Sequence, residues 1–143
     1  MLIHVLPDAD GSRCTLSFEE ANGWLRAIWR GYVDPMEAMR GAEHYLISAE
    51  PFHCPYLLND NVALRGPWFD SVEWLQQAWL PHAQRMGLRY IAHVVQADTR
   101  ADVLTLTFPE PVTSIIELQL FHTVAEAEEW LRTCQQATAR QPT

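Results

Sequence analysis

A buried-strand pattern followed by a loop and a capped helix is the feature of this sequence that most constrains its fold. Residues 56–60, Tyr-Leu-Leu-Asn-Asp, change from apolar to polar, Gly66-Pro67 supplies a loop, and Asp70 is placed to cap a helix. In an α/β fold such a junction lies at the carboxyl edge of the sheet, where ligands and partners are usually bound. Residues 56–73 therefore form the best candidate for a functional site.

Two adjacent strands are predicted before this junction. Residues 14–18 alternate between apolar and polar side chains, which is the period of a strand with one face in water, and Asn22-Gly23 supplies a tight turn. Residues 24–29 carry apolar side chains at both odd and even positions, as expected of a strand that is covered on both faces. We expect the first of these strands to lie at the edge of the sheet.

Helices alternate with the remaining strands, and each helix has a recognisable start or end signal. Asp34-Pro35 indicates one helix start, and residues 123–126, Thr-Val-Ala-Glu, form a capping box at another. Residues 97–114 fit either a helix or a strand, and we favour a short helix. The predicted helices are 35–50, 70–86 and 124–134, and the predicted strands are 56–59, 90–95 and 115–121.

This order predicts a single α/β domain over residues 1–143. Strands separated by helices pair through right-handed crossovers, so we expect a mostly parallel mixed sheet with an N-terminal antiparallel hairpin. A chain of 143 residues with 48% apolar residues suffices for one domain and its core. Residues 1–13 are expected to form an N-terminal extension and residues 135–143 a frayed tail.

Charge and cysteine content exclude several kinds of partner. A formal charge of -8 repels phosphate backbones and anionic lipids, so neither nucleic acid nor a membrane surface is an expected partner. Cys14, Cys54 and Cys134 are an odd number at wide spacing, which argues against a disulfide framework. Residues 1–6 are too short an apolar run for a signal peptide. We therefore expect a cytoplasmic protein.

Catalytic and cofactor motifs are not found. The histidines do not have metal-site spacing, and the glycines are too isolated for a phosphate-binding loop, so we expect no metal and no cofactor. His53-Cys54 lies between two prolines, and a rigid loop packing a small thiol explains it. A Cys54 nucleophile activated by His82 or His93 is the alternative.

Several motifs together resemble one known family. The element order is a hairpin followed by three β-α units, and the first motif lies at the exit from the second strand of the hairpin. The motifs are Trp29-Arg30-Gly31-Tyr32-Val33, Trp79-Leu80-Pro81, Gly87-Leu88, Phe121, Glu126-Ala127 and Trp130-Leu131. Over roughly residues 14–134 the chain resembles the bacterial stand-alone STAS-like proteins, of the anti-sigma-factor-antagonist superfamily.

The resemblance implies a regulatory module. In the regulatory branch of that family, an aspartate ends the strand before a switch loop, and the next helix begins with Asp-Ser, whose serine is phosphorylated by a partner kinase. Asp60 and Asp70-Ser71 occupy similar positions in this chain. A phosphate at this helix start would change the docking of partners.

The same residues also have purely structural explanations. Ser71 is explained as a first-turn serine beside the Asp70 cap. Asn59-Asp60-Asn61 is a run of turn-forming residues whose side chains bond to their own backbone, and this is the interpretation that we favour.

Tryptophans near the candidate site suggest a contact surface. Trp79 and Trp130 are expected in the core, whereas Trp74 falls roughly 140° from the centre of the apolar face of its helix. Together with Trp68 it would form an exposed aromatic patch of the kind that binds partners. The alternative is that the Gly-Pro loop folds over Trp74.

We therefore expect a non-enzymatic protein–protein interaction or regulatory module. Its partner would be another protein or a second copy of the chain, forming a homodimer. A small apolar, lipid-like ligand is the alternative, and an enzyme using Asp60, His53 or Cys54 is a third possibility. The candidate interaction surface comprises Asp60, Trp68, Asp70, Ser71 and Trp74.

Overall fold

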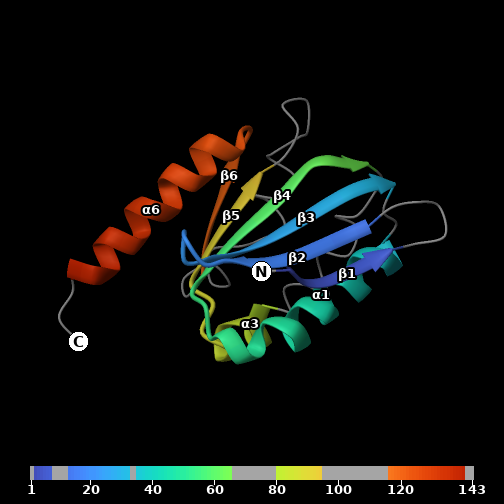
Figure 1. Ribbon diagram of the computed structural model, residues 1–143, viewed down its shortest axis with the longest axis horizontal. Coiled ribbons are helices and arrows are strands. Elements are labelled where there is room, and N and C mark those ends of the chain that lie inside the picture. Colours follow the sequence, from blue (N-terminus) through green and yellow to red (C-terminus); the bar gives the residue numbers. More distant parts are fainter. Residues whose placement is uncertain (1, 8–12, 33–34, 66–79, 95–115, 141–143) are drawn as a thin grey trace.

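A six-stranded sheet forms the centre of the computed structural model, which describes residues 2–7, 13–32, 35–65, 80–94 and 116–140 (Figure 1). The strands lie side by side in the order in which they occur in the sequence, so each connection moves the chain one strand further across the sheet. They are β1 Leu2–Pro7, β2 Arg13–Glu19, β3 Trp24–Tyr32, β4 Tyr56–Arg65, β5 Tyr90–Val94 and β6 Glu117–Phe121.

The pairing of the strands confirms the predicted fold class. β1 and β2 pair antiparallel, as do β2 and β3, whereas β3 to β6 pair in parallel. The result is an α/β fold with a mostly parallel mixed sheet and an N-terminal antiparallel hairpin. The edge position predicted for residues 14–18 is wrong, because β1 pairs with the outer side of β2. Part of the predicted N-terminal extension, residues 1–13, is therefore a strand of the sheet.

Helices lie on both faces of this sheet. α1 Pro35–Ala49 and the short α3 Leu80–Arg85 lie on one face, and α6 Val124–Arg140 lies on the other (Figure 1). α6 is longer than predicted. The tail expected at residues 135–143 is helical as far as Arg140.

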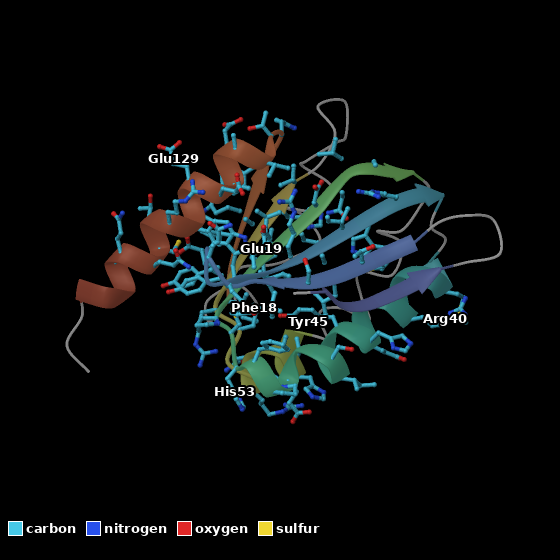
Figure 2. All side chains as sticks on the ribbon, viewed as in Figure 1. Phe18, Glu19, Arg40, Tyr45, His53 and Glu129 are labelled. Carbon is cyan, nitrogen blue, oxygen red and sulfur yellow. The ribbon has the colours of Figure 1, made fainter. Side chains whose placement is uncertain are left out.

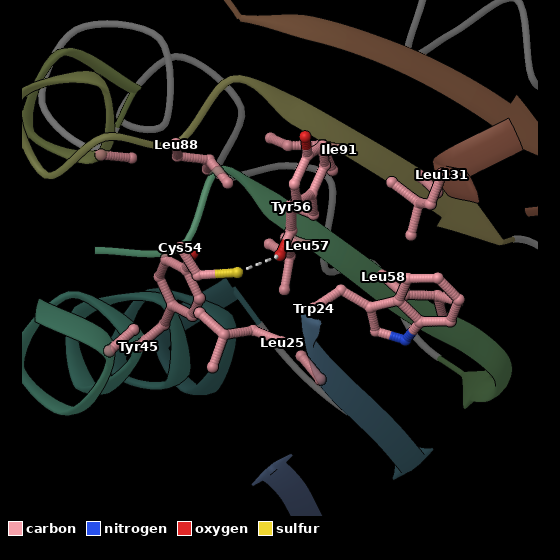
Figure 3. Packing of buried hydrophobic residues seen from close by; sticks show 14 of the residues in the cluster. Trp24, Leu25, Tyr45, Cys54, Tyr56, Leu57, Leu58, Leu88, Ile91 and Leu131 are labelled. Atoms are coloured by element: carbon pink, nitrogen blue, oxygen red, sulfur yellow. Dashed lines mark hydrogen bonds between the residues drawn. The ribbon is translucent and has the colours of Figure 1, made fainter. Parts of the chain in front are cut away.

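Side chains of β3 alternate between the two faces, and the buried core extends to both. Trp24 packs against α6, where Leu131 is buried and the guanidinium carbon of Arg132 lies 5.5 Å from the indole centroid. Leu25 points to the opposite face of the sheet, which is the face on which Tyr45 of α1 lies (Figure 3). The prediction that this strand is covered on both sides is confirmed.

Gly87 ends α3 in the predicted left-handed conformation, with a φ of 104°. The Leu88 N–H donates to the carbonyl of Ala83 at 3.1 Å, and the Gly87 N–H donates to that of Gln84 at 3.0 Å. This is the Schellman arrangement, in which the last carbonyls of a helix are satisfied by the residues that follow it. Ala83 and Leu88 are both buried, so the same cap fixes the helix end on the core.

Thr123 caps the start of α6 as predicted, and Glu126 bonds to its hydroxyl rather than to its backbone N–H. The Glu126 N–H donates to Thr123 Oγ1 at 3.2 Å, and the Thr123 hydroxyl donates to Glu126 Oε1 at 2.9 Å. Both bonds lie within one helical turn, and they fix the entry of the chain into α6.

At Gly41, α1 lies directly against the Trp29 ring of β3. A Cβ atom at this position would overlap Cη2 of the Trp29 ring and lie 2.8 Å from Cζ2. The absence of a side chain at residue 41 therefore lets the Trp29 ring of β3 pack directly on the helix backbone.

Replacing Gly41 with alanine tests this contact. In the interior of a helix alanine is normally more stabilising than glycine, by roughly 1 kcal/mol. Here we expect overpacking against Trp29 to make the substitution destabilising instead, so that Gly41→Ala lowers the free energy of unfolding by about 1–2 kcal/mol. In a Trp29→Leu background the same change should become neutral or stabilising. Urea denaturation of the four proteins measures both effects, and an equal cost in both backgrounds would show that the ring contact is not responsible.

Candidate functional site

β4 carries the first of the predicted site residues. The turn that we favoured for Asn59-Asp60-Asn61 is wrong, because all three residues lie inside this strand. Neighbouring strands pair with both edges of β4 at this point, with Asp60 opposite Ile28 of β3 and Val94 of β5. Backbone pairing on two sides outweighs the preference of Asn and Asp for turns.

A bulge follows Asp60 directly. The register between β3 and β4 shifts between Ile28 and Arg30, across from Asn61 and Val62. The Val62 N–H donates to Asp60 Oδ1 at 3.2 Å, so the side chain does bond to its own backbone, but within the strand. Bulges redirect side chains, and here Asn61 is buried while Val62 is 42% exposed.

Asp60 belongs to a charged cluster on the α6 side of the sheet. Arg26 Nη2 lies 3.2 Å from Asp60 Oδ2, and Arg26 Nη1 lies 3.7 Å from Glu19 Oε1, whose side chain is labelled in Figure 2. The Trp24 Nε1–H also donates to Glu19 Oε1, at 2.7 Å. Arg26 Nε is buried and has no hydrogen-bond partner within the described parts of the chain. Arg26 thus links carboxylates from two strands, and the Asp60 side chain is only 13% exposed.

A second polar cluster, on the opposite face of β4, was not found from the sequence. Asn59 Nδ2 lies 3.1 Å from His93 Nδ1, and Asn61 Nδ2 lies 3.2 Å from His93 Nε2. Asn59 Oδ1 is buried without a hydrogen-bond partner among the residues described. Two asparagines at i and i+2 of a strand share one face, and β5 places His93 opposite Asn59. That spacing was the available signal, but it was interpreted as a turn.

His93 is neutral in this cluster. The amide group of Asn61 is oriented by its bond to the carbonyl of Asn59, at 3.3 Å, and presents an N–H donor to the imidazole. A protonated ring has donors only and could not accept this bond. Burial also lowers the pKa of His93 to about 4, and the residue is 4% exposed.

Cys54 does not have the surroundings of an activated nucleophile. Its thiol donates to the carbonyl of Tyr56 at 3.3 Å (Figure 3) and to that of Gly23 at 3.6 Å, and burial raises its pKa. His93 pairs with Asn59, five residues further along, which corresponds to roughly 15 Å of extended chain. The structure therefore does not bring Cys54 and His93 together. Burial likewise raises the pKa of the other two thiols, those of Cys14 and Cys134.

The other four predicted site residues, Trp68, Asp70, Ser71 and Trp74, lie outside the described residues and remain predictions. Within the described ranges, no group of three or more His, Cys, Asp and Glu side chains is arranged to hold a metal ion. None of the helices in those ranges combines the length and apolarity needed to cross a bilayer.

Comparisons with known proteins gave no match: neither a family model, nor a curated protein, nor a solved structure corresponds to this chain. The similarity to STAS-like proteins rests on the sequence motifs alone and stays a prediction. The candidate site is accordingly defined by its own geometry, as two polar clusters on opposite faces of β4.

Protonation of His93 should make folding depend on pH between about 4 and 6.5. Its pKa is lowered on folding, so the unfolded chain binds more protons in this window, and stability present above pH 6.5 is lost as the pH falls. Between about pH 7.5 and about pH 5 this group alone should cost about 2 kcal/mol. Urea denaturation at both values measures the loss. His93→Gln should lose this pH-dependent loss of stability, whereas the exposed control His53→Gln should keep it. Identical pH dependence in His93→Gln and wild type would show that His93 is not the group responsible.

Removal of the Asp60 carboxylate tests whether the charged cluster is structural. We expect Asp60→Ala to cost about 1–3 kcal/mol, because Arg26 keeps only the more distant carboxylate of Glu19. In an Arg26→Met background the cost should largely disappear, which a double-mutant cycle from urea denaturation would show. A cost of Asp60→Ala within about 0.5 kcal/mol would mean that the ion pair does not support the fold.

Proposed function

We propose that the chain is a non-enzymatic protein–protein interaction or regulatory module whose contact surface begins at the carboxyl half of β4 and continues through residues 66–74. Val62 carries this proposal. It is 42% exposed and lies at the bulge of β4, two residues after Asp60. An exposed branched apolar side chain at a strand bulge is suited to a protein contact.

The described helices cover only part of the sheet face around Asp60. α6 packs on β4, β5 and β6, and none of the described helices lies over β1 or β2 on this side (Figure 1). The register places Thr15 opposite Ile28 and Ser17 opposite Arg26, so small polar side chains of β2 face the same side. A partner could therefore contact this face without displacing any described helix.

The chemistry of the described groups supports binding rather than catalysis. The Cys54 thiol donates to carbonyl groups, His93 is neutral and buried, and Asp60 is ion-paired to Arg26. A catalytic acid, base or nucleophile needs access to substrate and a pKa near the working pH. These side chains instead hold neighbouring strands and loops together.

The family resemblance supports a regulatory form of this function. In the proteins that the chain resembles, a partner kinase phosphorylates a serine at the start of the helix that follows this strand and loop. Ser71 is at the corresponding place in the sequence. A phosphate would add nearly two negative charges to a chain whose net charge is already -8, and would weaken the binding of an acidic partner.

Capture experiments with matched variants test the proposed surface. Immobilised wild-type protein should retain a specific protein from a lysate of its own cells, and both Val62→Glu and Trp74→Ala should reduce the amount retained. Gln136→Glu adds the same charge at an exposed position of α6 and should retain the wild-type amount. Because Val62 is exposed, Val62→Glu should change the free energy of unfolding by no more than about 0.5 kcal/mol. Undiminished capture by Val62→Glu would show that the contact lies elsewhere, and no specific capture by wild type would contradict the function itself.

A further inference from the structure

The outer side of α1 carries a stripe of four exposed side chains, Met36, Arg40, Glu43 and Ile47, which we call the α1 stripe. Met36 is 66% exposed and Ile47 is 70% exposed. At 100° per residue all four fall within roughly 60° of the helix circumference. The α1 stripe is therefore a narrow band with an apolar residue at each end and opposite charges in the middle.

This stripe lies opposite the side on which α1 packs against the sheet. Tyr45 and Ala49 are buried, and Gly41 meets the ring of Trp29. Figure 2 shows Tyr45 between the helix and the sheet and Arg40 at the outer margin of the helix. Packing of α1 on its own sheet therefore leaves the α1 stripe without a role in the fold.

Two copies of the stripe match when the helices pack antiparallel. A two-fold axis between residues 41 and 42 places Met36 opposite Ile47 of the second copy, and Arg40 opposite Glu43 of the second copy. Each pair occurs twice, so two ion pairs lie between two apolar pairs that are about 16 Å apart. A parallel arrangement would instead place Arg40 against Arg40 and Glu43 against Glu43.

We propose that a second copy of this chain docks on the α1 stripe, through antiparallel two-fold packing of α1 against α1. The net charge of -8 makes two copies repel each other over most of their surfaces, whereas the stripe is locally neutral and its charges attract in this register. A contact between single helices buries less than the roughly 800 Å² per partner of a standard interface, so the dimer is reversible. This inference concerns a different surface from the proposed function and does not depend on it.

Charge reversal and charge exchange on the full chain test the register. Sedimentation velocity over a concentration series up to about 300 μM, a range suited to a weak interface, should show a monomer–dimer equilibrium. Arg40→Glu and Glu43→Arg should each weaken dimerisation by about tenfold or more, because like charges then meet twice. The double variant Arg40→Glu, Glu43→Arg should return to within about threefold of wild type, since the same two pairs are restored in reverse. Glu129→Arg makes the same charge change as Glu43→Arg on the exposed side of α6 (labelled in Figure 2) and should have no effect.

Cross-linking under a mild oxidant provides an independent measure of the same register. A variant carrying both Met36→Cys and Ile47→Cys should form disulfide-linked dimers, whereas each single variant should not, because each of these residues faces the other type across the axis. A protein that is monomeric throughout the series would overturn the inference. So would a dimer that Arg40→Glu does not weaken, or a charge-exchanged variant that fails to recover.

Discussion

Burial of β3 and β4 on both faces is the constraint on which the rest of the structure depends. Trp24 and Leu25 point to opposite faces and are both buried, as are Leu57 and Leu58 of the neighbouring strand. Parallel strands of this composition need helices on each side.

The described helices that connect parallel strands, α1 and α3, share one face, as expected when right-handed crossovers all move in the same direction. Among the described helices, α6, which follows the last strand, is the one that covers the other face. α6 covers β4 to β6, and none of the described helices lies over the polar face of β2 on that side.

The polar character of residues 59–61 follows from where β4 lies relative to its neighbours. β5 is described as far as Val94, opposite Asp60, and β4 continues beyond Asp60 to Arg65 while it pairs with β3. The polar side chains on the two faces of β4 have separate hydrogen-bonding and ion-pair partners. On one face Asn59 and Asn61 contact a neutral His93, and on the other Asp60 pairs with Arg26. Each cluster joins β4 to a neighbouring strand through side chains. These contacts fix the strand register at the point where the apolar side chains of β4 give way to polar ones.

Features of the fold that depend on local interactions could be predicted from the sequence, and those that depend on distant partners could not. The Gly87 cap and the Thr123 cap each involve bonds spanning at most five residues, so their signals lie together in the chain. The turn predicted at residues 59–61 failed because the competing backbone pairs involve residues more than thirty positions away. The end of α6 was missed for a similar reason: Gln135 Nε2 donates to the carbonyl of Asn22 at 2.7 Å and anchors the last helical turns to the turn between β2 and β3. In the candidate site, Asp60 could be chosen because the sequence changes there from apolar to polar, but sheet register alone brings Arg26 to Asp60 and His93 to the neighbouring asparagines.

The two faces of the sheet also determine how the two proposed surfaces are related. The α1 stripe points away from the sheet on the α1 side, whereas Asp60 and its charged cluster lie on the α6 side. In a dimer joined through α1, the two sheets are therefore separated by both α1 helices, and the two surfaces around Asp60 face away from each other. A small partner could not contact both proposed surfaces at once, so each copy in such a dimer would bind its own partner. Avidity then arises only for a partner that is itself repeated or displayed on an array, because simultaneous binding requires a spacing that matches the dimer. Dimerisation would thus increase the number of partners bound per assembly and leave the affinity at each surface unchanged.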